Sequence, residues 1–116
     1  MRLILESGDK NAPQRSEVEL TISGGNVTGR LIGTHRTQAR TLSIRADIKG
    51  TYDPVQDFLH ARIDGIAFEV RGGSESNARE IFMGGFRGSL KDGTGGWGGR
   101  GNSNDQITNG SYRVAP

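Results

Sequence analysis

The sequence contains no cysteine and only three prolines among its 116 residues. Without cysteine the chain can form neither disulfide bonds nor thiolate metal sites, so its hydrophobic core must stabilise the fold. Long hydrophobic runs are missing as well, since the run nearest the N-terminus is only Leu3-Ile4-Leu5. A signal peptide needs roughly 7–15 apolar residues, and a membrane-spanning helix needs about 20. We therefore expect a cytoplasmic protein that does not contact a membrane.

Strong charge of one sign and abundant aromatic residues are also missing. The formal net charge is +2, and aromatic residues make up 6% of the chain. A low net charge and regularly patterned apolar residues argue against intrinsic disorder. Glycine, by contrast, is abundant, with 19 residues. Because glycine inside a helix costs about 1 kcal/mol relative to alanine, a helix bundle is disfavoured. The length predicts a single domain over residues 1–116.

Apolar and polar residues alternate in several segments, which is the pattern of a half-buried antiparallel strand. We predict about eight strands, at residues 2–6, 16–23, 27–33, 41–50, 57–64, 66–72, 79–90 and 106–115. The core residues predicted from the alternation are Val18, Leu20, Ile22, Leu42, Ile44, Ile48, Leu59, Ile63, Ile66, Phe68 and Val70. The short stretch 74–80 is the best candidate for a helix.

Turn residues separate the predicted strands. Gly24-Gly25 lies between two strands, and Asp92-Gly93 and Asn109-Gly110 are dipeptides typical of hairpin turns. The short connections favour an all-β fold, a small antiparallel up-and-down β-barrel of about eight strands. A two-sheet β-sandwich is the alternative. The barrel is favoured because large and small residues alternate on one face of the segment 82–90, from Phe82 to Leu90, as a tapering interior requires.

Two glycine-containing segments resemble the strands of calycin-type barrels, the avidins and lipocalins. They are Gly25-Asn26-Val27-Thr28-Gly29-Arg30 and Ile48-Lys49-Gly50-Thr51-Tyr52-Asp53. The resemblance implies an up-and-down barrel that binds a small ligand in its interior. The chain departs from avidins in having a single tryptophan, Trp97, and from lipocalins in lacking their N-terminal Gly-x-Trp signature.

Positive charge is concentrated between Leu20 and Ala46, a stretch without any Asp or Glu. We predict that an anion binds there to Arg36 and Arg40, together with Arg30 or Arg45 and with His35 nearby, since arginine pairs well with phosphate and carboxylate. The alternative is an ordinary solvated loop between two strands. We do not expect nucleic acid to bind, because the stretch has no aromatic residue on which bases could stack.

The glycine-rich segment 91–105 carries Trp97 and is predicted to be a mobile loop. A tryptophan among glycines and asparagines resembles the sugar-binding loops of some β-rich lectins. The alternative is a hairpin end whose tryptophan caps the barrel.

Catalytic residues are not evident in the sequence. It has no Gly-x-Ser-x-Gly motif, and its two histidines, His35 and His60, are far apart in the chain. The carboxylates between residues 53 and 80 alternate with arginines and are best explained as cross-strand ion pairs. We predict no cofactor and no metal, and we rank an enzyme last among the possible functions.

Two functions therefore lead: a non-catalytic binding module for a small anionic or apolar ligand, and an assembly subunit that forms homo-oligomers. The second follows from the alternation on the strand at 79–90. If Phe82, Phe86 and Leu90 point inward, then Ile81 and Met83 point outward, where Phe58 also faces. A bulge at Gly84-Gly85 would exchange the two faces and return Ile81 and Met83 to the core. Ile4, opposite Leu3 and Leu5 in the alternation, is a further predicted outward residue.

Overall fold

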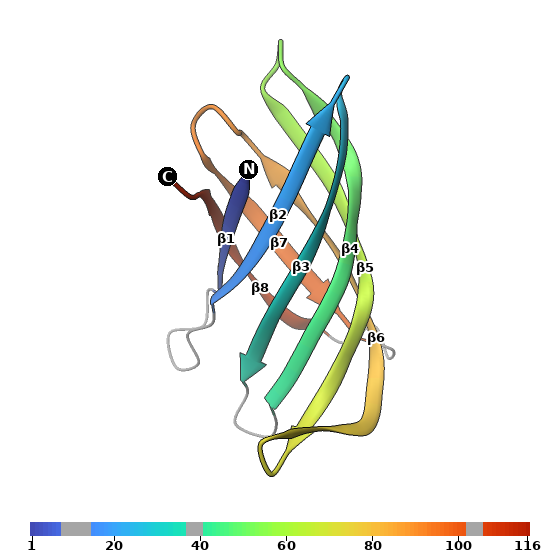
Figure 1. The fold of residues 1–116 in the computed structure, drawn as a ribbon. Coiled ribbons are helices and arrows are strands. Elements are labelled where there is room, and N and C mark those ends of the chain that lie inside the picture. Colours follow the sequence, from blue (N-terminus) through green and yellow to red (C-terminus); the bar gives the residue numbers. More distant parts are fainter. Residues whose placement is uncertain (8–14, 37–40, 102–105) are drawn as a thin grey trace.

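Eight antiparallel strands close into one barrel in the computed structural model, which describes residues 1–7, 15–36, 41–101 and 106–116 (Figure 1). The strands are β1 (Arg2–Ser7), β2 (Arg15–Ser23), β3 (Asn26–Arg36), β4 (Thr41–Asp53), β5 (Phe58–Arg71), β6 (Ser74–Gly88), β7 (Thr94–Arg100) and β8 (Gln106–Val114). Each strand pairs with the next along the chain, and β1 also pairs with β8. The predicted up-and-down barrel is therefore confirmed, and the β-sandwich alternative is wrong.

Two hairpins turn on pairs of glycines with positive φ. Gly24 and Gly25 have φ values of 58° and 84°, and Gly72 and Gly73 have values of 60° and 81°. Both pairs suit a two-residue type I′ turn, whose two central residues need positive φ. The first turn was predicted from the sequence. The second shows that the helix predicted at 74–80 is wrong, because those residues begin β6.

Strand β5 is continuous, whereas the sequence predicted two strands broken near Gly65. Gly65 stays in the ladder, paired with Ala46 on one side and Phe82 on the other. The inward phase that starts at Leu59 therefore continues through Gly65 to Ala67, which is fully buried. Ile66, predicted as core, lies on the outer face and is 38% exposed. Phe68 and Val70, also predicted as core, are only half-buried.

The core fills the barrel, and most of it follows the predicted alternation. The predicted residues that are buried are Val18, Leu20, Leu42, Ile44, Ile48, Leu59 and Ile63, whereas Ile22 is partly buried at the edge of the core. Phe82 and Phe86 point inward, and the exposed Ile81 and Met83 point outward, as predicted. Gly84 and Gly85 pair with successive residues on both neighbouring strands, so no bulge exchanges the faces there.

The glycine-rich segment contains a strand of the barrel, and the prediction of a loop was wrong for Thr94–Arg100. The predicted turn at Asn109-Gly110 is wrong as well, since both residues pair with β7 inside β8. On the inner face of β7, glycines make room for aromatic rings. A Cβ atom on Gly99 would lie 2.2 Å from the nearest atom of the Phe82 ring, and one on Gly95 equally close to the Tyr112 ring.

Gly99→Ala should destabilise the barrel by about 1–3 kcal/mol, because the added methyl group overpacks the interior against Phe82. Phe82→Leu removes the outer ring atoms, so the same glycine substitution should cost less in that background. Urea unfolding of the wild type, the two single variants and the double variant would measure the coupling. Strictly additive costs would show that the ring does not dictate the glycine.

Candidate functional site

The residues predicted to bind an anion are not gathered into one site by the described parts of the chain. Arg30 lies on the outer face of β3, where its Nε is 3.9 Å from Oδ1 of Asp47 in an exposed ion pair. Arg45 lies on the outer face of β4 and contacts Glu75 instead. Arg40 and the side chains of His35 and Arg36 lie outside the described residues. The site at Arg36 and Arg40 therefore stays a prediction.

Trp97 lies inside the barrel on β7, four strands from Arg30. Its side chain is buried, with 8% of the residue exposed, and its indole N–H donates a hydrogen bond of 3.1 Å to the main-chain oxygen of Glu6. A sugar would need an exposed indole face for stacking, which this ring does not present. Trp97 therefore lies in the middle of a strand and packs in the core, rather than capping the barrel from a hairpin end.

The interior of the barrel is occupied by large side chains. Phe82, Phe86 and Tyr112 are fully buried there, and the rings of Phe86 and Tyr112 meet edge to face with centroids 6.1 Å apart. An eight-stranded barrel is just wide enough to be filled by its own side chains or to hold one small ligand. Because side chains fill the core, the outer surface is where a binding site is expected.

One end of the barrel is closed by a cluster of hydrogen bonds around Asp57, which has a positive φ of 53°. Its carboxylate accepts hydrogen bonds from the hydroxyl groups of Tyr52, at 2.6 Å, and of Ser89. It also accepts hydrogen bonds from the backbone N–H groups of Leu90 and Lys91, at 3.0 and 3.1 Å. Asp57 thus ties the turn after β4 to the turn after β6. Sequence reasoning treated this carboxylate as one among many, because its partners in the second turn lie more than 30 residues away.

The ionisation of the cluster follows from these contacts. Desolvation raises the pKa of Asp57, but the hydrogen bonds from Ser89, Tyr52, Lys91 and Leu90 outweigh it and hold the pKa far below its usual range. The hydrogen bond to Asp57, followed by desolvation and nearby negative charge, raises the pKa of Tyr52 to about 12. Burial, followed by the charge of Asp57, raises the pKa of Tyr112 to about 12. With four donors satisfying it, the carboxylate serves to hold the two turns together.

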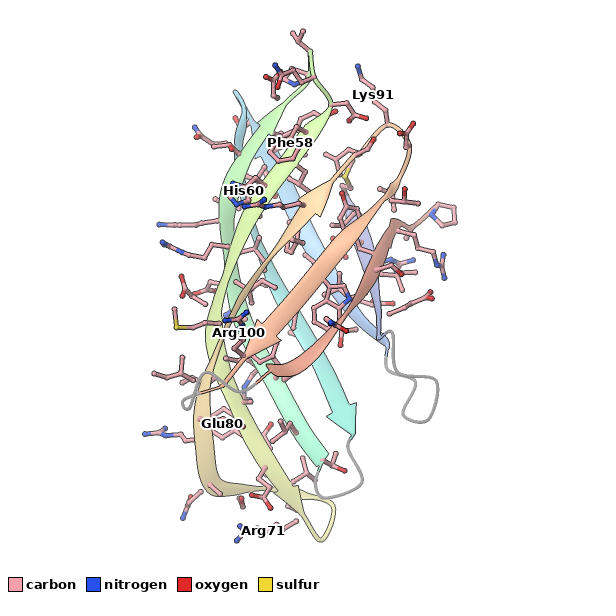
Figure 2. The ribbon with its side chains drawn as sticks, turned by 180° about the vertical axis from the view of Figure 1, so that it is seen from behind. Phe58, His60, Arg71, Glu80, Lys91 and Arg100 are labelled. Atoms are coloured by element: carbon pink, nitrogen blue, oxygen red, sulfur yellow. The ribbon has the colours of Figure 1, made fainter. Side chains whose placement is uncertain are left out.

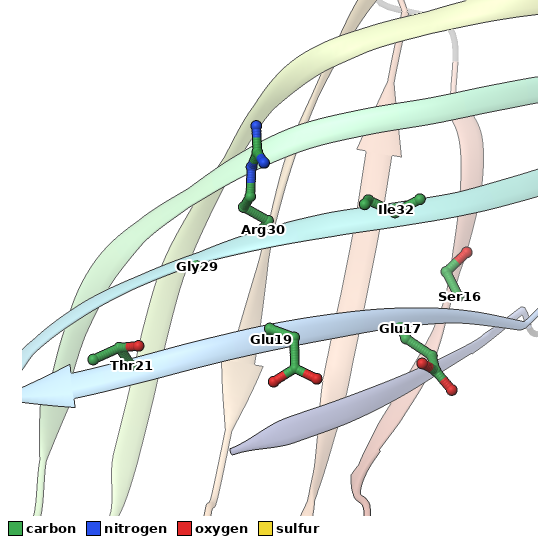
Figure 3. A pocket seen from close by; sticks show the side chains of 7 residues that line it. All are labelled: Ser16, Glu17, Glu19, Thr21, Gly29, Arg30 and Ile32. Carbon is green, nitrogen blue, oxygen red and sulfur yellow. The ribbon is translucent and has the colours of Figure 1, made fainter.

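A groove of about 790 Å³ runs along the outer side of β2 and β3 (Figure 3). Glu17 and Glu19 project from β2 and make this side acidic, while Arg30 and Ile32 project from β3. Ile32 is 64% exposed, although it is a large apolar residue.

A second groove, of about 340 Å³, shares Arg30 and Ile32 with the first and crosses β4 to reach β5. Arg45 lies in it, with its guanidinium carbon 4.5 Å from the centroid of the Phe68 ring and with Nη2 donating to Glu75 at 2.8 Å. The contact with Arg45 explains why Phe68 is half-buried although it lies outside the core. A cation over an aromatic face is stabilised by the ring's quadrupole.

Exposed apolar residues line up across the strands beside this groove. Ile32 pairs with Arg45, Arg45 with Ile66, and Ile66 with Ile81 in the register of the barrel. Met83 follows Ile81 on the outer face of β6 and is also exposed. We call the outer surface formed by Ile32, Arg45, Ile66, Phe68, Ile81 and Met83 the β3–β6 face. Sequence reasoning found Ile81 and Met83 but missed Ile32 and Ile66.

Two other residues predicted to face outward differ from this group. Phe58 is exposed at the start of β5, beside His60, with ring centroids 6.2 Å apart (Figure 2). Ile4 has the expected outward phase, between Glu17 and Arg113 on the neighbouring strands, but it is only 2% exposed. Ile4 is therefore no part of an exposed surface, contrary to the prediction.

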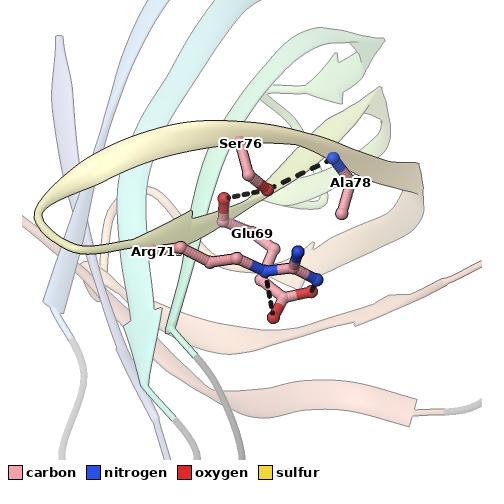
Figure 4. A network of polar contacts seen from close by, with 4 residues as sticks. All are labelled: Glu69, Arg71, Ser76 and Ala78. Atoms are coloured by element: carbon pink, nitrogen blue, oxygen red, sulfur yellow. Dashed lines mark hydrogen bonds and ion pairs between the residues drawn. The ribbon is translucent and has the colours of Figure 1, made fainter.

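Arginines of β5 find carboxylates two residues along the same strand, whereas the sequence predicted partners across the strands. Arg62 Nε lies 2.8 Å from Asp64, and Arg71 donates two hydrogen bonds of 3.3 Å to Glu69 (Figure 4). The main-chain oxygen of Glu69 accepts from the hydroxyl of Ser76, which itself accepts from the amide of Ala78. This network holds the irregular pairing between β5 and β6 near Glu69.

Asp57→Asn should lower stability at neutral pH, because a neutral amide cannot accept all four hydrogen bonds. Asparagine tolerates positive φ, so the turn itself is retained. The folded-state pKa of Asp57 lies below the unfolded value of about 3.9. Its stabilisation is therefore complete above about pH 4 and is lost as the pH falls further.

Thermal melts from neutral pH to about pH 2 should show the difference between wild type and Asp57→Asn shrinking below about pH 4. Asp92→Asn, an exposed change in the neighbouring turn, is the matched control and should leave the melting profile unchanged. A constant difference across the whole pH range would contradict the role assigned to the Asp57 charge.

Among the described residues, no three His, Cys, Asp or Glu side chains lie together as a metal site would require. No helix able to cross a membrane occurs in the described part of the chain. In comparisons with known proteins, the chain matches no family model and no curated protein.

Proposed function

We propose that this barrel is a non-catalytic assembly subunit that pairs with a second copy of itself through the β3–β6 face. The observation that carries the proposal is the row formed by Ile32, Arg45, Ile66 and Ile81, which are successive partners across four strands. Apolar residues scattered singly on a surface mean little, but an aligned group marks an interface. Arginine and methionine, both present on this face, are enriched at protein interfaces.

The distribution of charge favours a second copy as the partner. The β2 side of the face is acidic, with Glu17 and Glu19, and the β6 side carries Arg79, which makes no ion pair with the described residues. A two-fold axis parallel to the strands and passing near β4 would lay β3 of each copy over β5 of the other, with β2 and β6 at the two rims. The acidic rim of each copy would then lie nearest the arginine rim of the other, as a symmetric interface requires.

The face is modest in size, since β3 and β6 are three strand spacings apart, or about 14 Å. Stable interfaces usually bury at least about 1,000 Å² in total, so we expect a dimer of moderate affinity. The resemblance to calycin barrels suggests a small ligand in the interior as another use of the fold. The side chains that fill the interior favour the outer surface instead.

Ile32→Asp and Ile66→Asp should each convert the dimer into a folded monomer, because the new carboxylate at the centre of the interface must be desolvated and the neighbouring Arg45 is already paired with Glu75. Val55→Asp is the matched control, since Val55 is 91% exposed and lies in the turn after β4, away from the face. Sedimentation velocity at micromolar concentrations gives the oligomeric state, and circular dichroism verifies the fold. A wild type that sediments as a monomer, or a dimeric Ile32→Asp variant, would contradict the proposal.

Charge exchange tests the two-fold arrangement itself. Glu17→Arg and Arg79→Glu should each weaken the homodimer, because each places like charges at both edges of the interface. Mixing the two variants should restore a dimer, since the Glu17→Arg copy is basic at both edges and the Arg79→Glu copy is acidic at both. If the mixture stays monomeric while both variants are folded, the acidic and basic edges do not face each other.

A further inference from the structure

Two neighbouring rows on the outer surface, beyond the β3–β6 face, contain positive charge without any carboxylate across β4 to β7. In the first row Lys49 pairs with Arg62, and Arg62 pairs with Gly85. In the second row His60 pairs with Arg87, and Arg87 pairs with Gly96. The rows are completed by Thr51 on β4 and Gly98 on β7, which carry no charge.

A hollow of about 420 Å³ overlaps these rows. His60, Arg87 and the two glycines Gly85 and Gly96 line it together with Phe86 and Trp97, whereas Lys49 and Arg62 lie in the row beside it. Figure 2 shows His60 on the outside of β5. Two glycines, Gly85 and Gly96, leave the backbone at its base bare. Packing does not require glycine at 96, because a Cβ atom there would meet only the main-chain oxygen of Gly110, at an ordinary 3.8 Å. Its small size keeps the hollow open.

The positive charges around the hollow are only partly balanced within the described part of the molecule. Lys49 and Arg62 are directly opposite each other, and like charges in such a pair destabilise a sheet. Arg62 has a partner in Asp64, at 2.8 Å. Lys49 and Arg87 make no ion pair or side-chain hydrogen bond with the described residues. The fold therefore retains a repulsion that a bound anion would relieve.

We propose that this hollow binds a small oxyanion of the phosphate type, held by Arg87 with His60 beside it and with Arg62 and Lys49 reaching it from the neighbouring row. Arginine donates paired, charge-assisted hydrogen bonds to such oxygens. Arg62 and Arg87 are diagonal neighbours on β5 and β6, about 7–8 Å apart, so their long side chains can reach one small ion together. The inference is independent of the proposed dimer, because the hollow lies on rows that contain no residue of the β3–β6 face.

The test is titration with inorganic phosphate, read as the shift in the thermal-unfolding midpoint with ionic strength held constant by NaCl. A ligand that binds only the folded state raises the midpoint in a concentration-dependent way. Arg87→Gln should weaken phosphate binding by about tenfold or more, the loss of its charge-assisted hydrogen bonds. In low-salt buffer without phosphate the same change should raise the midpoint, because it removes repulsion. A merely structural arginine would lower it.

Gly96→Val fills the hollow and should abolish the phosphate shift while leaving the midpoint without phosphate unchanged. Arg71→Gln, an exposed arginine near the far end of β5, is the matched control and should keep the full phosphate shift. Equal shifts with phosphate and NaCl, or an undiminished phosphate shift in Arg87→Gln, would overturn the proposal. Stabilisation by heparin but not by phosphate would overturn it too, since it would indicate a diffuse cationic surface.

Discussion

The pairing of β1 with both β2 and β8 is the constraint on which the rest of the structure depends. A closed sheet has an inside and an outside everywhere, so alternation assigns each strand residue to one or the other. The inside is narrow, which explains why the rings of Phe82 and Tyr112 lie against glycines on β7. The Asp57 cluster completes this closure, since it fastens two turns at one end of the barrel.

Closure also determines what the surface can recognise. Where strands are paired on both sides they offer no free edge to a partner, so recognition there depends on outward side chains arranged in cross-strand rows. The β3–β6 face and the cationic hollow occupy neighbouring rows of this kind. Asp64 belongs to the row of Met83, and Arg62 belongs to the row of Gly85. The ion pair between Asp64 and Arg62 therefore marks the boundary between an apolar surface and a basic one.

Strand phase could be predicted from the sequence, because the period of alternation needs no knowledge of the partners. The limits of the strands could not be predicted in the same way. Gly65 was interpreted as a break, which shifted the phase by one residue and misplaced Ile66 in the core. The number of strands was correct because two errors offset each other: β5 was divided in two and β7 was missed. The glycines of β7 look like a loop in sequence because the rings that require them, those of Phe82 and Tyr112, belong to other strands.

The candidate sites depend even more on contacts between strands, which the sequence does not reveal. Sequence reasoning looked for positive charge along the chain and found the acid-free stretch between Leu20 and Ala46. Along a strand, however, residues advance by about 3.3 Å, so Arg30 and Arg36 are about 20 Å apart even on one face. Across strands, directly paired residues are about 5 Å apart. Lys49, Arg62 and Arg87 come from three separate segments, yet the register pairs Lys49 with Arg62 and places Arg87 in the neighbouring row. In a closed meander of this kind a site is a row across strands, and it becomes visible only once the register is known.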